Sequence, residues 1–588
     1  MLLLASPPAG AQPAAVRRAE PVPYQAPDPR TLLGPAPADL APVIERYTSD
    51  WRSLRRFYDL PFSPASERVM QQFYEAWLAE IGQIHFDSLP LEGRIDYILF
   101  ENKLEHEIRQ LELNRNRWAE MTVLLPFAAA IIELKEARQR VDPMEPAKAA
   151  AAVANVGKQV DELSARLNDP AKGTFQVRKT VAFRAARTVD RLRDVLKSWF
   201  EFYDGYDPVF TWWVAEPYRT TATAMEKYAG LIREKLIGIK PGDRDTIVGD
   251  PVGREALLSG LAYEMIPYTP EELIEIANRE FAWCDSEMLR ASREMGYGDD
   301  WKKALERVKL DYVPPGQQAS LALSLALEAI DYVESHNLVT VPQLARDTWR
   351  IQMMPPERQR VNPFFLGGEV LSVSYPVAGM SEEQKLMTMR GNNIHFSRAT
   401  VFHEVIPGHY LQQFMSGRYR PYRELFSTPF SVEGWALHWE MLLWDHGFPK
   451  TPENRIGMLF WRMHRCARII FSLSFHLEKM TAAECVDFLV NRVGHERDNA
   501  AGEVRRSFES EEYGPLYQAA YMLGALQFGA LHKDLVGAGR MSDREFHDEI
   551  LKMGPIPVEM VRAGFAKQTL DAGFRTRWKF YGESPAAR

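Results

Sequence analysis

Apolar residues recur at helical spacing along most of this 588-residue chain. From residue 38 to about 235 the spacing is helical throughout, which predicts a mostly α-helical protein. Thr269-Pro-Glu-Glu272 combines an N-cap residue, a proline in the first turn and a capping-box glutamate, so a long helix should follow to about Met295. Helical spacing also predicts helices over 66–84, 91–114, 147–167, 430–440, 458–479, 499–508 and 513–532.

The period changes between about 338 and 376. Residues 338–341, 350–353 and 369–375 alternate along their length and contain β-branched side chains, which predicts three short strands. This small β-sheet comes just before the histidine-containing stretch. Two roles stay open for it: an exposed edge strand that binds a peptide by strand addition, or a structural hairpin that covers the core.

Residues 121–132 form an uncharged run of 12 residues that is interrupted by Pro126. A membrane-spanning helix needs about 20 apolar residues, so we expect a buried helix and no transmembrane segment. With 46% hydrophobic residues, the composition is that of a globular protein. The net charge of −8 offers no electrostatic basis for binding nucleic acid or an anionic membrane. The three scattered cysteines predict neither a disulfide framework nor a metal cluster.

The first 12 residues resemble the tail of a secretory signal, with a short apolar run and the cleavage-type site Ala9-Gly-Ala11 but no basic segment. They predict a periplasmic or secreted protein, and the alternative is a disordered tail on a cytoplasmic one. No cysteine follows the run, so a lipid anchor is not expected. We therefore divide the chain into a signal remnant with an Ala/Pro-rich linker, residues 1–37, and one large helical domain with two lobes, residues 38–588.

His403, Glu404 and His409 lie inside an otherwise apolar run. Two histidines beside a glutamate are what a zinc hydrolase needs, because neutral imidazoles bind the metal and the carboxylate takes a proton from water. In the common motif H-E-x-x-H the histidines are four residues apart, on one helical face. Here they are six apart, which rotates the second side chain by about 240°. The two can meet only if Pro407 and Gly408 interrupt the helix as a two-residue bulge; the alternative is a kinked core helix with incidental histidines.

A third ligand is available on the helix expected over 430–440. Glu433 and Glu440 are seven residues apart, about two turns, so both can face one side. Glu433 would complete a His2Glu set with one open position, the arrangement of catalytic zinc sites. Glu440 would then accept the N–H of a ligand imidazole. His438 lies about 140° around the helix from Glu433, so we leave it out of the ligand set.

Three segments together resemble the bacterial domain-of-unknown-function 885 family: H-E-V-I-P-G-H at 403–409, E-G-W-A at 433–436 and G-P-L-Y-Q-A-A-Y-M-L-G at 514–524. The likeness extends over most of the chain. That family is similar to the helical zinc metallopeptidases of the thermostable carboxypeptidase and thimet oligopeptidase groups. The resemblance implies a large multi-helix, zincin-like fold with the site in a deep cleft.

Tyr513, Tyr517 and Tyr521 are four residues apart and form one stripe on the helix expected over 513–532. Most such stripes pack in a core. The site described so far lacks a donor for the oxyanion that forms on an attacked carbonyl. Because the family resemblance places this segment at the cleft, Tyr521 is the candidate donor, and Tyr517 is a candidate substrate contact.

The predicted function is that of a zinc-dependent peptidase, with Zn²⁺ as cofactor and Glu404 as the general base and later acid. The family likeness suggests short peptides as substrates. Arg505 is the candidate partner of a substrate carboxylate, with Arg506 and Arg468 as alternatives. Two other functions stay open: a zinc hydrolase of a non-peptide amide or ester, and a catalytically silent peptide-binding scaffold. Glu404 argues against the scaffold, which needs no base; the oligomeric state stays open.

Overall fold

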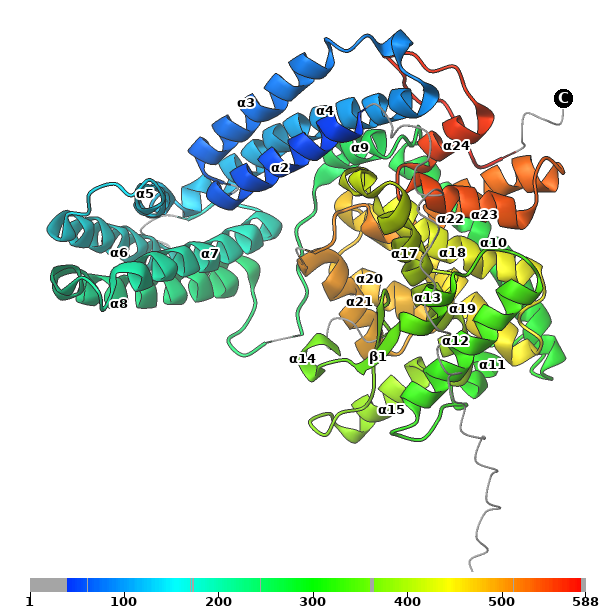
Figure 1. Cartoon of the computed structure of the whole chain (residues 1–588). Coiled ribbons are helices and arrows are strands. Elements are labelled where there is room, and N and C mark those ends of the chain that lie inside the picture. Colours follow the sequence, from blue (N-terminus) through cyan, green and yellow to red (C-terminus); the bar gives the residue numbers. More distant parts are fainter. Residues whose placement is uncertain are drawn as a thin grey trace, which may run out of the picture.

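Helices make up most of the chain, as the sequence predicts (Figure 1). The computed structural model describes residues 40–582 apart from 61, 170, 172–173, 244, 360–363 and 511, so the segment expected over 1–37 lies outside the described residues. The α-helices are α2 (Ala41–Phe57), α3 (Pro64–Ile81), α4 (Leu91–Met121), α5 (Ala128–Gln139), α6 (Pro146–Asn168), α7 (Lys179–Tyr203), α8 (Pro208–Leu231), α9 (Gly253–Tyr263), α10 (Pro270–Glu294), α11 (Trp301–Val308), α12 (Gln318–Ser335), α13 (Gln343–Thr348), α14 (Pro356–Gln359), α15 (Glu382–Gly391), α16 (Ile394–Glu404), α17 (His409–Tyr419), α18 (Pro429–Asp445), α19 (Pro452–His476), α20 (Ala482–Phe488), α21 (Arg497–Glu509), α22 (Tyr517–His532), α23 (Asp543–Met553) and α24 (Val558–Ala566). The shorter 3-10 and π segments are η1 (Phe86–Ser88), η2 (Thr122–Leu124), η4 (Ile232–Ile237), η5 (Pro421–Phe426), η6 (Leu489–Val493) and η7 (Lys533–Gly537).

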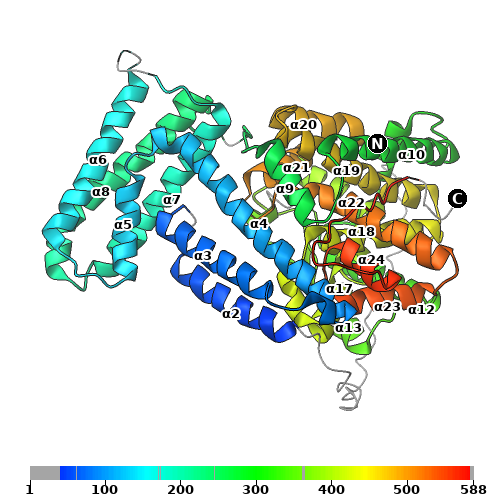
Figure 2. The same cartoon turned by 90° about the horizontal axis from the view of Figure 1, so that it is seen from above.

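Buried hydrophobic side chains form two clusters. One is built mainly by α5–α8 with η4, the bundle that lies apart at the left of Figures 1 and 2. The other is built by α2–α4 and by most elements from α9 onward. Helix α4 takes part in both, because Ile95 and Leu104 pack in the second cluster while Met121 at its end packs in the first. The division into one domain with two lobes stays a prediction.

Three of the helices around the motif residues, α16, α18 and α19, begin at side-chain caps. Asn393, Thr428 and Thr451 accept backbone N–H groups from the first turns of α16, α18 and α19. Such caps satisfy donors that have no partner inside the helix. The capping box predicted at Thr269 and Glu272 is confirmed, and α10 begins at the proline between them. Local sequence therefore sets where these helices begin.

The uncharged run over 121–132 is not one buried helix. Helix α4 continues to Met121, a 3-10 turn follows, and α5 begins only at Ala128. Pro126 has no N–H and disfavours helical backbone in the residue before it; Leu125 accordingly has φ −131° and ψ 41°. Among the described residues, no helix is both long enough and apolar enough to cross a membrane.

Residues 338–341 do not form the predicted strand. The N–H of Thr340 donates to Asp548 Oδ1 at 2.8 Å, and the carbonyl of Leu338 accepts from Nδ1 of His547 at 2.8 Å. Both partners are side chains of α23. The backbone groups of this segment are thus bonded to a helix rather than to a neighbouring strand.

The other two predicted strands are confirmed as β1 (Arg350–Met353) and β2 (Val370–Val373). They pair in parallel, with Arg350 opposite Val370 and Met353 opposite Val373. A parallel pair needs a crossover connection, so β1 and β2 do not form a hairpin with each other. Within β2, Ser372 forms an isolated antiparallel bridge with Leu366. Period-2 alternation identifies a strand but does not say which way its partner runs.

Helices α18 and α22 cross at two glycines. A methyl group built on Gly524 would lie 2.0 Å from the carbonyl oxygen of Phe430, and one built on Gly434 would lie 2.5 Å from the Cα of Gly524. Larger side chains would therefore force the helices apart. This crossing fixes α18, which carries both motif glutamates, against α22, which carries the tyrosines.

We expect Gly524→Ala to destabilise the protein by about 1–3 kcal/mol or more. The added methyl overlaps the carbonyl oxygen of Phe430, which cannot move without moving the backbone of α18. Gly529→Ala, also on α22, is the matched control, since its methyl meets no described atom within 4 Å. Gly529→Ala should be as stable as the parent, or more stable by up to about 1 kcal/mol. Urea unfolding followed by circular dichroism measures both. Equal stabilities for the two variants would contradict the close crossing.

Candidate metal centre

The two motif histidines lie on different helices. Helix α16 ends at Glu404 and α17 begins at His409, and the peptide bond before Pro407 is cis. Across the break, the N–H of Gly408 donates to the carbonyl of Phe402 at 3.0 Å. This hydrogen bond spans six residues instead of the four of an α-helix, so two extra residues are inserted. The interruption predicted from the spacing is present, as a break between two helices rather than a bulge within one.

Two contacts hold this break. The indole Nε1 of Trp435 donates to the carbonyl of Pro407 at 2.9 Å, which ties the break to α18. A methyl group on Gly408 would lie 1.8 Å from the carbonyl oxygen of His403, so the backbone of α16 occupies the space that a side chain would need. Glycine is therefore required here for space.

The side chains of His403, His409 and Glu433 converge and are buried. Glu433 Oε2 lies 3.1 Å from His409 Nε2 and 3.5 Å from His403 Nε2. Within the described part of the chain this oxygen has no partner in hydrogen-bond geometry. Nitrogen and oxygen ligands about 2.0–2.1 Å from a tetrahedral zinc ion are about 3.3 Å from one another. The donor types and their separations thus fit a zinc site.

Glu440 holds His403 from the opposite side of its ring. Its Oε1 accepts from Nδ1 of His403 at 2.7 Å, which leaves Nε2 directed toward Glu433. Burial lowers the pKa of His403, but the neighbouring carboxylates of Glu433 and Glu440 outweigh burial and raise the pKa to about 9. These carboxylates therefore favour a positive charge at this point, whether a proton or a metal ion.

Glu404 lies beside the same groups and offers an oxygen within 4.8 Å of ligand atoms of His403 and His409. Burial raises the pKa of Glu404, which makes its carboxylate a stronger base than one in water. The segment that leads into β2 packs directly against it: the N–H of Gly368 donates to the Glu404 carbonyl at 3.2 Å. A methyl group on Gly367 would lie 2.4 Å from Glu404 Oε2.

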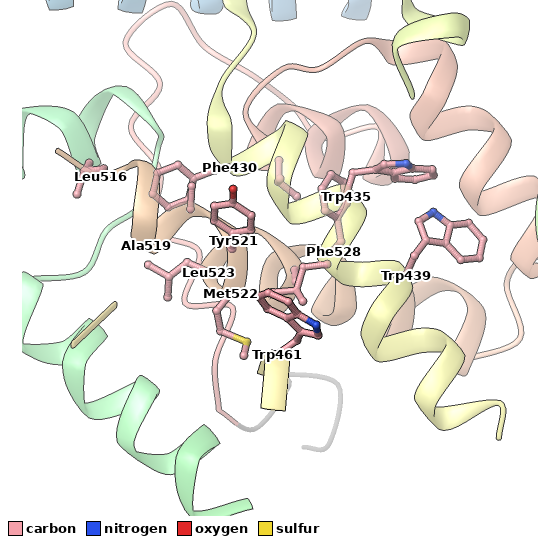
Figure 3. Packing of buried hydrophobic residues seen from close by; sticks show 14 of the residues in the cluster. Phe430, Trp435, Trp439, Trp461, Leu516, Ala519, Tyr521, Met522, Leu523 and Phe528 are labelled. Atoms are coloured by element: carbon pink, nitrogen blue, oxygen red, sulfur yellow. The ribbon is translucent and has the colours of Figure 1, made fainter. Parts of the chain in front are cut away.

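Tyr517 and Tyr521 form a hydrogen-bonded chain that ends at Glu433. Tyr521 donates to the Tyr517 hydroxyl at 3.1 Å, and Tyr517 donates to Glu433 Oε1. The Tyr521 ring lies 6.0 Å from the ring of His403, and Figure 3 shows it among packed apolar side chains. Burial raises the pKa of Tyr521 to about 12, so its hydroxyl keeps its proton at neutral pH. Tyr513 precedes α22 instead of lying on it.

Two cavities meet at Glu433. The smaller, of about 260 Å³, is lined in part by Glu404, His409 and both tyrosines. The larger, of about 1080 Å³, extends between α4, α7, α9 and the start of α22, and shares Val432, Glu433 and Tyr517 with the smaller one. Glu433 therefore borders a space wide enough for a ligand larger than a single residue.

Arg505 is not among the residues that line the smaller cavity. Its Nη1 pairs with Glu509 at 3.0 Å and its Nη2 donates to the Asp245 carbonyl at 3.1 Å. The two alternatives, Arg468 and Arg506, do line this cavity. The structure thus places Arg468 and Arg506, and not Arg505, at this cavity. Neighbouring residues on a helix point about 100° apart, and only packing shows which one faces the cavity.

Sequence reasoning missed Arg465 and Glu503 as members of this site. Arg465 lines the cavity and lies 3.5 Å from Glu440 Oε1, while Glu503 Oε1 accepts from Arg468 Nε at 2.7 Å. A signal was present: charged residues on helices as apolar as α19 are rarely buried unless they are paired or functional.

The comparisons with other proteins identify a family and a fold. The model of a family described as "Bacterial protein of unknown function (DUF885)" matches residues 55–564. The fold is shared with a solved structure described as a "putative lipoprotein of unknown function" from Shewanella oneidensis: TM-score 0.66, 18% identity, 90% of this chain and 100% of that chain covered. A "putative lipoprotein" from Colwellia psychrerythraea has TM-score 0.55 and 15% identity, with 90% and 97% covered. No curated protein matches the chain.

We expect Gly408→Ala to disrupt the break between α16 and α17, because its methyl would overlap the His403 carbonyl. The free energy of unfolding should fall by about 3 kcal/mol or more, which is the range for severe packing errors. Gly417→Ala on α17 is the control, since no described atom lies within 4 Å of its methyl. Denaturant unfolding measures both; a Gly408→Ala protein as stable as the control would show that the break tolerates a side chain.

Proposed function

The chain belongs to the bacterial DUF885 family of unknown function, and we propose that it is a zinc-dependent peptidase that hydrolyses short peptides. One observation carries the proposal. Two imidazole nitrogens and a carboxylate oxygen from three helices converge at separations of 3.1 and 3.5 Å, with a second carboxylate, Glu404, beside them. A buried His2Glu set with an adjacent base is the arrangement of catalytic zinc.

His403, His409 and Glu433 would hold the ion, and Glu440 would fix the ring of His403. A zinc ion bound there supplies Lewis-acid activation of a water molecule and of the scissile carbonyl. Glu404 takes the proton of the attacking water and later delivers it to the leaving amine. Tyr521 is the proposed donor to the developing oxyanion, and it reaches Glu433 through Tyr517.

The shape around the site supports an extended substrate. The larger cavity of about 1080 Å³ adjoins the candidate ligands and is lined by residues of the N-terminal helices as well as of α22. The proposed zincin-like architecture and peptide substrate follow from this space and from the likeness to helical zinc peptidases. A location in the cell envelope or outside the cell belongs to the same proposal. It is supported by the signal-like first residues and by the "putative lipoprotein" descriptions of the structural neighbours.

We expect purified protein to carry about one zinc ion per chain. His403→Ala and Glu433→Ala should each abolish stoichiometric zinc binding, because each removes a direct ligand. Glu440→Ala should retain zinc but bind it about 10–100-fold more weakly, the usual effect of losing the partner of a ligand imidazole. His336→Ala, on an exposed histidine, is the control.

Elemental analysis and competition with a chelating dye measure these values. Equal losses of zinc affinity in Glu433→Ala and Glu440→Ala would show that the roles of direct ligand and of partner to the His403 ring have been assigned wrongly. A parent protein without zinc after expression in zinc-supplemented medium would overturn the site.

We expect Glu404→Gln to keep its zinc and its fold while peptide cleavage falls by about 10²–10⁴-fold. Glutamine preserves size and one hydrogen bond but cannot accept the proton. Glu383→Gln, at an exposed position of α15, should cleave like the parent. Mass spectrometry of a mixed peptide library measures peptide cleavage by the parent and by both variants. A zinc-loaded parent that cleaves no peptide would replace the peptidase proposal with a non-peptide hydrolase or a binding scaffold.

A further inference from the structure

Three buried arginines line the smaller cavity beside the candidate ligands. Arg465 and Arg468 lie on α19, Arg506 lies on α21, and their side chains are 4%, 2% and 7% exposed. Arg465 and Arg468 enclose the ring of Tyr521, with guanidinium carbons 4.5 and 4.3 Å from its centroid. The arginines therefore stand next to the proposed oxyanion donor, deep enough that each charge needs a partner.

Two of these arginines share one carboxylate. Glu503 serves two of them, at 2.7 Å from Arg468 and 3.7 Å from Arg506. Glu440 lies 3.5 Å from Arg465 but is already bonded to His403 at 2.7 Å. Within the described part of the chain, Arg468 Nη1 is buried without a hydrogen-bond partner. A buried guanidinium N–H without an acceptor is costly, so an acceptor supplied by a ligand would stabilise it.

The net charge of the site also favours a ligand that supplies an acceptor. Glu404 and Glu433 line this space together with three guanidiniums, and Glu440 and Glu503 pair with two of those guanidiniums, which gives four carboxylates in all. With the two positive charges of the zinc ion proposed above, one net positive charge remains, and the exposed Arg358 at the cavity adds another. The cavity thus favours a negatively charged ligand.

We propose that Arg468, together with Arg465 and Arg506, binds the C-terminal carboxylate of a peptide, so that the protein acts as a carboxypeptidase. The inference rests on the proposed peptidase function and names the substrate of that site. The arginine planes offer paired N–H groups that match the two oxygens of a carboxylate.

The sizes of the two cavities support a terminal rather than an internal position. The arginines line the cavity of about 260 Å³, which lies below the usual range of about 300–1,000 Å³ for small-molecule sites. It suits one end of a ligand. The cavity of about 1080 Å³ lies next to it across Glu433 and leaves room for the rest of the peptide. The last residue would occupy the arginine side, and the preceding residues the larger cavity.

The test compares peptides of one sequence that end in a free carboxylate or in a carboxamide. The zinc-loaded parent should release the last residue of the free acid and cleave the amide at least about 10²-fold less efficiently, since the amide leaves a buried charge unmatched. Arg468→Ala should reduce kcat/KM for the acid to about the level of the amide, so that the variant no longer distinguishes the two peptides. Arg468→Lys should recover part of the loss. Arg505→Ala, whose side chain bonds Glu509 outside the cavity, is the matched control and should behave like the parent.

A binding measurement separates this inference from the peptidase proposal. Calorimetry with the zinc-loaded Glu404→Gln protein should show tighter binding of the acid than of the amide, and Arg468→Ala in that background should remove the difference. If the parent cleaves no peptide but this preference is present, the carboxylate site stands and the peptidase proposal fails. If peptides are cut internally, or acid and amide bind equally, the peptidase proposal survives and the C-terminal assignment is overturned. An amide peptide with a penultimate glutamate that binds as tightly as the free acid would assign the arginines to a side-chain carboxylate instead.

Discussion

The site depends on one backbone constraint: two histidines six residues apart must present their ring nitrogens to the same point. A continuous helix cannot do this, because six residues rotate a side chain about 240°. The chain ends α16 at Glu404 and begins α17 at His409, with a hydrogen bond that spans six residues across the break. The glycine in the break is packed so closely against α16 that no side chain fits.

Helix α18 transmits this constraint to the rest of the site. Its Trp435 bonds the backbone of the break, its Glu433 faces both histidines, and its Glu440 fixes the ring of His403. The glycine crossing with α22 then sets the distance to the tyrosines, one of which bonds Glu433. A shift of α18 would therefore displace ligands, supporting hydrogen bonds and the proposed oxyanion donor together, which explains why the helix is buried along most of its length.

Buried charge is the second organising element. The site holds four carboxylates and three guanidiniums in a largely buried space, where isolated ions are costly and each must be matched. The carboxylates around His403 raise its pKa, and Arg468 and Arg506 share Glu503 as a counter-ion. One region of the cavity thus attracts a cation and the adjoining region an anion. A metal-dependent hydrolase acting on a charged substrate needs both.

Sequence alone determined the mostly helical class, the capped start of α10, two of the three predicted strands, and the histidine and glutamate residues that come together. Those features depend on local periodicity, caps and spacing, which operate within a few turns of chain. It did not determine the direction of strand pairing, the partners of residues 338–341 or the end of α4 before Pro126. From the sequence, Arg505 is the expected arginine of the site. Packing instead places Arg465, Arg468 and Arg506 at the cavity, while Arg505 pairs with Glu509. Which face of a helix meets a cavity, and which charges share it, depends on residues that are distant in the sequence, from Arg358 to Tyr521 around the smaller cavity. Only the tertiary structure therefore decided them.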